Sequence, residues 1–88
     1  MTQNQPVDVI SVCSADGTIK PLRLRIANEG QQFQRIDVDQ VVSTMEIQHV
    51  GVESTVFLCR GRVGDRTCLF ELKYDLRTHS WCLMRKIY

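Results

Sequence analysis

The stretch TVFLCRGRVGDRTCLFELKY, residues 55–74, decides the fold class of this chain. Its centre, Val63-Gly64-Asp65-Arg66, offers a two-residue turn with glycine first, which a type II′ hairpin turn favours because that position has a positive φ. Antiparallel pairing outward from this turn places the apolar residues of both runs on one face. The predicted pairs on that face are Phe57 with Leu72, Cys59 with Phe70, and Gly61 with Cys68.

A third strand extends this sheet. The polar loop at residues 75–80 lets the chain return antiparallel, so that Trp81 faces Tyr74 and Leu83 faces Leu72. The apolar face then continues across three strands, and we expect Trp81 to belong to the hydrophobic core.

A second hairpin is predicted near the N-terminus. Residues 7–13 are rich in β-branched side chains, and Asp16-Gly17 is a strong hairpin-turn signal. A three-residue loop ending at Gly17 would place Ile10 opposite Leu22, whereas a two-residue loop would place it beside Arg23. The first alternative is preferred because it keeps the apolar side chains together.

Irregularities are expected in the next two runs. Pro21 lacks an N–H, so it indicates a strand start, an edge or a bulge. In the run at residues 31–38, Phe33 has one parity and Ile36 and Val38 have the other, which indicates a bulge or a strand shared by two sheets.

Residues 37–50 can be read in two ways. Apolar residues at 38, 41, 42 and 45 have helical spacing, with Asp39 as a possible cap. The high β-branched content favours a bent strand instead. The predicted fold class is all-β, a small antiparallel barrel or rolled sheet of six to seven short strands, with one short helical turn near residues 39–46 as the open alternative.

Length and composition describe one small globular domain. The chain of 88 residues has room for a single core, so residues 1–88 are predicted to form one domain with residues 1–6 as a frayed lead-in. No apolar run approaches the roughly 20 residues that cross a bilayer, and the N-terminus lacks signal-peptide features. We therefore predict a cytoplasmic protein. The net charge of +1 favours neither nucleic acid nor anionic lipid strongly.

No recognisable motif for catalysis or metal binding is present. The cysteines at positions 13, 59, 68 and 82 lack the close-spaced pairs of zinc sites, and each falls in a predicted strand, where a free thiol packs as a small apolar group. His79 and Ser80 are neighbours in a loop, which cannot supply an oriented nucleophile, base and third group. Asp37 and Asp39 could hold Mg²⁺, but solvent-facing strand positions explain them as well. We predict a non-enzymatic protein without cofactor or metal.

The face of the closing sheet opposite the predicted core suggests a partner. It carries several apolar side chains among its charges, whereas a fully solvated face would be mostly polar. We therefore favour a protein-interaction or self-association module, most simply a homodimer. The rival explanation is that residues 37–50 cover this face within one chain. The predicted interface residues are Val56, Leu58, Leu69, Met84 and Tyr88.

A nucleic-acid-binding barrel is the alternative function. Four arginines on predicted strands could contact phosphates: Arg23, Arg25, Arg60 and Arg62. Bases would need aromatic platforms to stack on, but Phe57, Tyr74 and Trp81 all face the core in the predicted register.

Three segments carry a resemblance: Pro21-Leu22-Arg23-Leu24-Arg25, then Val38-Asp39-Gln40-Val41, then Phe70-Glu71-Leu72-Lys73-Tyr74-Asp75 followed by Trp81-x-Leu83. Together they resemble a loose group of small bacterial all-β domains of unestablished function. The shared motifs are structural, and domains of this kind sometimes lie near genes for DNA-repair polymerases. The resemblance implies a bacterial origin and favours nucleic-acid work slightly, but it transfers no site residue.

Overall fold

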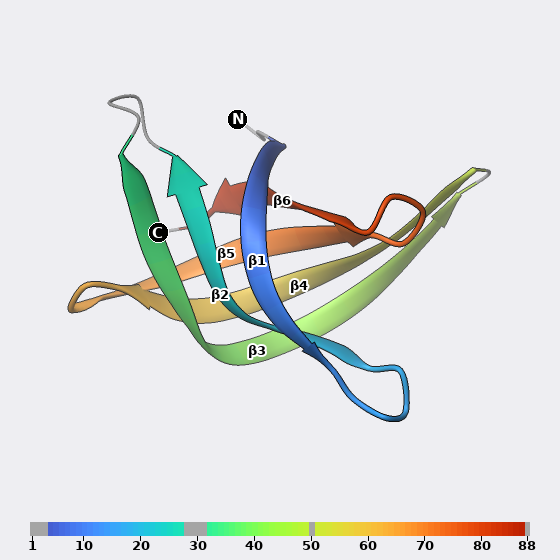
Figure 1. Ribbon diagram of the computed structural model, residues 1–88, viewed down its shortest axis with the longest axis horizontal. Coiled ribbons are helices and arrows are strands. Elements are labelled where there is room, and N and C mark those ends of the chain that lie inside the picture. The colour runs from blue at the N-terminus through green and yellow to red at the C-terminus, as the bar shows by residue number, and fades with distance from the viewer. Residues whose placement is uncertain (1–3, 28–31, 50, 88) are drawn as a thin grey trace.

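The chain forms an all-β barrel, seen in a computed structural model that describes residues 4–27, 32–49 and 51–87 (Figure 1). Its strands are antiparallel neighbours in chain order, and the last pairs with the first to close the barrel. This confirms the predicted fold class. The six strands are β1 (Gln5–Cys13), β2 (Ile19–Ala27), β3 (Phe33–His49), β4 (Val52–Val63), β5 (Arg66–Asp75) and β6 (Ser80–Lys86).

The barrel closes through a short seam between β1 and β6. Gln5 pairs with Leu83 and Val7 with Trp81, so only three residues of β1 take part. Gln5 and Pro6, which were expected in the N-terminal lead-in, lie within β1 at this seam.

The closing sheet has the predicted core register. Gly64 has a φ of +63°, as a type II′ turn requires, and all three predicted pairs between β4 and β5 are present. Tyr74 also faces Trp81 and Leu72 faces Leu83. A bulge beside Glu71 shifts the end of β6, so that Arg85 rather than Met84 lies opposite Glu71.

In the first hairpin the predicted three-residue loop is confirmed, but the predicted pairing of Ile10 is wrong. Gly17 has a φ of +90° and the Ser14 N–H donates to the Thr18 carbonyl, as in the preferred three-residue loop. The predicted pairing of Ile10 with Leu22 is nevertheless wrong, because a bulge between the pairs of Ile10 and Ser11 places Ile10 opposite Arg23. The bulge follows Pro21, which is buried and has no N–H to give to a regular ladder.

Two further bulges bend β3. The strand pairs with β2 through Phe33–Asp37 and with β4 from Asp37 onward, so it serves two parts of the barrel. Its pairing shifts once between Val38 and Gln40 and again between Val41 and Ser43. Residues 39–46 are strand throughout, which excludes the alternative of a helical turn there.

The interior is apolar and well covered. Trp81 lies at the edge of the core and is half-buried, with ring centroids 5.4 Å from Phe57 and 4.8 Å from Tyr74. The buried cluster consists of Leu24, Ile26, Ile36, Phe57, Cys59, Cys68, Phe70, Leu72 and Leu83.

Candidate functional site

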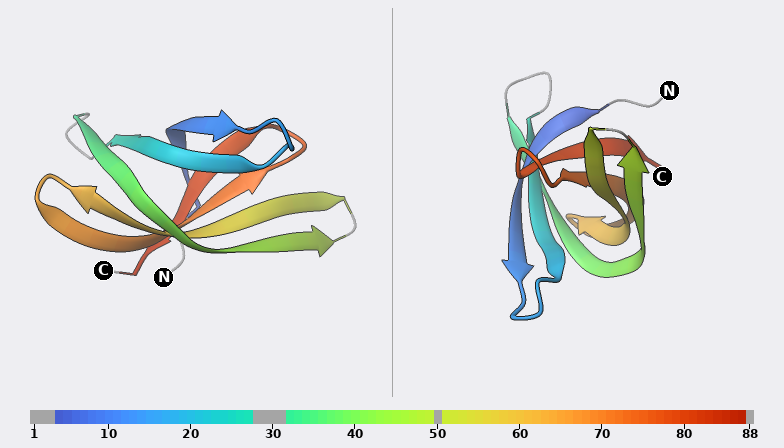
Figure 2. Two further views of the ribbon diagram at one scale, coloured as in Figure 1. Left: turned by 90° about the horizontal axis from the view of Figure 1, so that it is seen from below. Right: turned by 90° about the vertical axis from the view of Figure 1, so that its right-hand side faces the viewer.

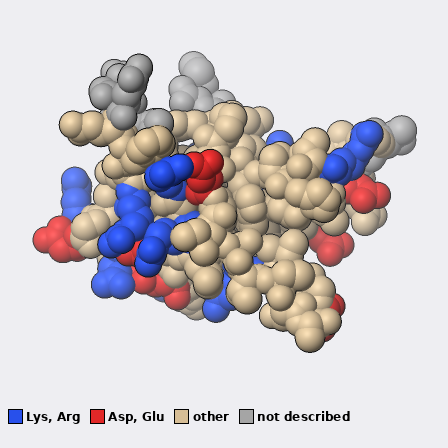
Figure 3. Space-filling model, viewed as in Figure 1, with Lys and Arg blue, Asp and Glu red and all other residues tan. Residues whose placement is uncertain are grey.

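Arginine side chains gather on the outer face of β2, β3 and β4. Figure 3 shows basic side chains concentrated over one end of the molecule, interspersed with acidic ones. Strand pairing produces this arrangement, because Asp37 lies opposite both Arg23 on β2 and Arg62 on β4, while Arg25 lies opposite Arg35. We call this group the arginine face; its cations are Arg23, Arg25, Arg35, Arg60 and Arg62.

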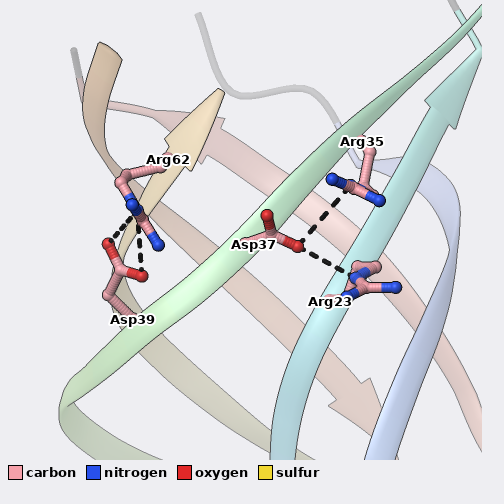
Figure 4. A network of polar contacts seen from close by, with 5 residues as sticks. All are labelled: Arg23, Arg35, Asp37, Asp39 and Arg62. Atoms are coloured by element: carbon pink, nitrogen blue, oxygen red, sulfur yellow. Dashed lines mark hydrogen bonds and ion pairs between the residues drawn. The ribbon is translucent and has the colours of Figure 1, made fainter. Parts of the chain in front are cut away.

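Aspartates partly neutralise the arginine face. Asp37 is shared, since its Oδ1 lies 2.9 Å from Nε of Arg23 and 3.7 Å from Nε of Arg35 (Figure 4). Arg62 pairs with Asp39 at 3.0 Å. The other contacts are the ion pair between Arg25 and Asp8 and the hydrogen bond from Arg60 Nη1 to Gln40 Oε1 at 3.1 Å.

These pairs orient the guanidinium groups but leave part of each group exposed to solvent. Each arginine in them is about half-exposed, and exposed ion pairs contribute only about 0–1 kcal/mol. Five arginines face three aspartates here, so the cations outnumber the carboxylates by two. A phosphate can therefore take over guanidinium donors at little cost.

An exposed aromatic ring lies beside these cations. The Phe33 side chain is 62% exposed, and the guanidinium carbon of Arg25 stands 4.2 Å from the ring centroid. The ring borders a surface hollow of about 320 Å³. The hollow is lined by Asp8, Val9, Ile10, Arg23, Leu24, Arg25, Phe33 and Arg35.

Sequence reasoning found four of the five arginines but missed Arg35 and Phe33. The signal for them was alternation: Ile36 is buried in the core, so residues at odd positions nearby, Phe33, Arg35 and Asp37, share the opposite face. The imperfect parity of Phe33 indicated a bulge or a strand shared by two sheets, and its exposed ring was not predicted. An exposed aromatic ring therefore lies on β3, whereas Phe57, Tyr74 and Trp81 pack in or against the core.

The predicted self-association face is less open than expected. Val56 is only 5% exposed, while Leu58, Leu69 and Met84 are half-buried. Tyr88 lies outside the described residues. Met45, which pairs with Val56 on this face, is 58% exposed and adds apolar surface that the prediction omitted.

Cys59 and Cys68 are buried and Cys82 is half-buried, whereas Cys13 is exposed, so the expectation that each thiol packs as an apolar group is wrong for Cys13. Burial raises the pKa of Cys59 to about 12, and burial also raises the pKa of Cys68 and of Cys82, so these three favour the neutral form. All four cysteines are free. Within the described ranges no group of three or more His, Cys, Asp or Glu side chains could hold a metal ion.

The described part of the chain contains no helix long and apolar enough to cross a membrane.

In comparisons with protein-family models, curated proteins and solved structures, nothing matches the chain.

Proposed function

We propose that this protein is a non-enzymatic binding module that holds single-stranded nucleic acid on the arginine face. The observation that carries the proposal is the exposed ring of Phe33 among Arg23, Arg25 and Arg35. Proteins that bind single strands combine a cationic track for the phosphates with aromatic rings on which bases stack. Both parts occur here within one hollow.

The geometry favours a single strand over a duplex. A duplex hides the flat faces of its bases, whereas a single strand can lay a base on the Phe33 ring. The Arg25 guanidinium already occupies one side of that ring and can pair with the incoming phosphate or stack with the base. The net charge of only +1 implies modest affinity rather than tight binding.

The salt dependence of oligonucleotide binding and the substitution of Phe33 test this proposal. With about three phosphates contacted, the slope of log K against log salt should be about −2 for a single strand, because each contact releases counterions. Phe33→Ala should weaken binding of a fluorescent oligothymidylate about 5- to 150-fold, the range measured for one stacked base. Fluorescence anisotropy at low and moderate salt measures both effects.

Arg85→Ala is the control for a substitution to alanine outside the hollow. Arg85 pairs with Glu71 on the β5–β6 side of the barrel, away from the hollow at Phe33. It should bind the oligonucleotide nearly as well as the unaltered protein. The proposal fails if no binding occurs at low salt, or if Phe33→Ala and Arg85→Ala behave alike.

Self-association is the second candidate function. It is supported by apolar side chains that stay partly exposed on the outer face of the closing sheet, namely Leu58, Leu69 and Met84 with Met45 beside them. Val56 can add little contact area because it is already buried. Burial of such a patch contributes about 25 cal/mol per Å² of apolar surface before the costs of association.

A charge placed in this patch separates a dimer from a monomer. Met84→Lys or Leu58→Lys should convert a dimer into a folded monomer, because each would bury an unpaired charge at its interface. Ala15→Lys adds the same charge in the exposed loop between β1 and β2 and should leave association unchanged. Sedimentation at tens of micromolar protein measures the outcome, and a monomeric unaltered protein rejects this candidate.

A further inference from the structure

One long edge of β3 has no strand beside it. The pairing of β2 with β3 ends at Arg23 and Asp37, and beyond that point β3 pairs only with β4. Figure 2 shows the far part of the β3–β4 hairpin diverging from the β1–β2 hairpin. Within the described residues, the edge at residues 43–49 therefore offers the N–H and C=O groups of every second residue, those that point away from β4, to solvent over about 23 Å. We call this the open edge.

The open edge lacks the features that usually protect such strands. Natural edge strands carry lysines, prolines or bulges that discourage pairing with another chain. Residues 43–49 contain neither lysine nor proline, and their pairing with β4 is regular from Ser43 to His49. Both bulges of β3 precede this stretch. The edge is consequently straight enough to accept a further strand.

A groove runs along the inner side of the open edge. It consists of two hollows of about 360 Å³ and 70 Å³, which share Glu46, Thr55 and Leu76 in their walls. Phe57 and Tyr74 also line the larger hollow, so part of the wall is aromatic. Side chains projecting from one face of an added strand would enter this groove.

The groove is acidic. Its lining includes three carboxylates, Asp16, Glu46 and Glu53, and no lysine or arginine. The backbone N–H of Thr18 donates to Asp16 Oδ1 at 2.9 Å, which lowers the pKa of that carboxyl and keeps it ionised. The groove thus has the opposite charge to the arginine face, and it suits a cationic partner.

We propose that an extended segment of a partner protein, alternating apolar residues with lysine or arginine, adds as a strand to the open edge. Main-chain hydrogen bonds to residues 43–49 would supply affinity, and contacts of cationic side chains with Glu46 and Glu53 would supply selectivity. A second copy of this chain is a poorer occupant, because its own open edge would bring Glu46 and no cation to carboxylates. This inference is independent of nucleic-acid binding.

A blocked heptapeptide, Val-Lys-Val-Lys-Val-Lys-Val, tests the proposal. Titrated into the full chain, it should shift the amide resonances of residues 43–49 and slow hydrogen exchange at the alternate N–H groups that point away from β4, because these groups gain partners. The same peptide N-methylated at alternate valines keeps its charge but loses donors, so it should bind at least about tenfold more weakly. The Val-Glu analogue should not bind measurably.

Two variants distinguish the effect of a charge change in the groove from the effect of the same change elsewhere on the protein. Glu46→Lys should weaken peptide binding about tenfold, since it replaces an attraction with a repulsion. Asp65→Lys makes the same charge change in the β4–β5 turn and should have little effect. Oligothymidylate should not displace the peptide, which distinguishes this site from the arginine face.

Each contrary result identifies a different error. Equal binding of the N-methylated peptide would show that charge alone attracts it, and absence of binding at millimolar peptide would reject strand addition. Protection, in the free protein, of those N–H groups of residues 43–49 that point away from β4, together with a dimer in sedimentation, would mean that a second copy occupies the edge. Any of the three overturns the proposal.

Discussion

Gly61→Ala is expected to destabilise the protein by at least about 3 kcal/mol, at or beyond the upper end of the usual range for an overpacked interior. A Cβ at this position would lie 2.4 Å from the Asp37 carbonyl oxygen and 2.9 Å from Cε1 of Phe70. Neither neighbour can move easily, since one is backbone at the crossing of β3 and the other is a fully buried ring. A domain of this length has a total stability of only about 4–13 kcal/mol.

Urea denaturation followed by circular dichroism measures this loss, and Gly64→Ala is the control. Gly64 has open space around it but a positive φ, so alanine there should cost only about 1 kcal/mol. If both variants lose the same small amount, β3 does not approach β4 as closely as described.

Phe70→Ala should have the second large effect, a loss of about 3–5 kcal/mol. The Phe70 ring is fully buried and lies opposite Cys59, in the middle of the interior cluster. Its removal leaves a cavity that surrounding strands cannot fill, because their backbones are held by ladders on both sides.

The same substitution at Phe33 provides the comparison. Phe33 is 62% exposed, so Phe33→Ala should change stability by less than about 1 kcal/mol. Thermal and urea unfolding of the two variants therefore test which phenylalanine belongs to the core and which to the surface. Equal losses would contradict the assignment, as would a weakened fold in Phe33→Ala alone.

The closing sheet could be predicted because its determinants are local. Gly64 specifies a two-residue turn, and alternation along residues 55–74 then predicts the register that pairs Phe57 with Leu72 and Cys59 with Phe70 on one face. The same reasoning identified the loop at Gly17 and the irregularity at Pro21. It could not say which form the irregularity takes, and so paired Ile10 with Leu22 instead of Arg23.

The residues of the candidate site come together through pairing between strands that are far apart in the sequence. Arg23 and Arg62 meet across Asp37 only because β3 pairs with β2 up to that residue and with β4 from it. The bulges that allow this bend carry no turn motif of their own. Arg35 precedes both bulges, and its alternation with the buried Ile36 was visible in the chain, although the predicted set of arginines did not include it.

By itself the sequence determined the all-β class and the core pairs of the closing hairpin, since turn chemistry and two-residue alternation act between near neighbours. Only the tertiary structure decided which outer faces became continuous and which edge stayed unpaired. Pairing of Phe33–Asp37 with β2 places Phe33 and Arg35 beside the arginines of β2, and the two bulges beyond Asp37 precede residues 43–49, which pair with β4 alone among the described strands. Those outcomes depend on packing all six strands at once, which no local pattern encodes.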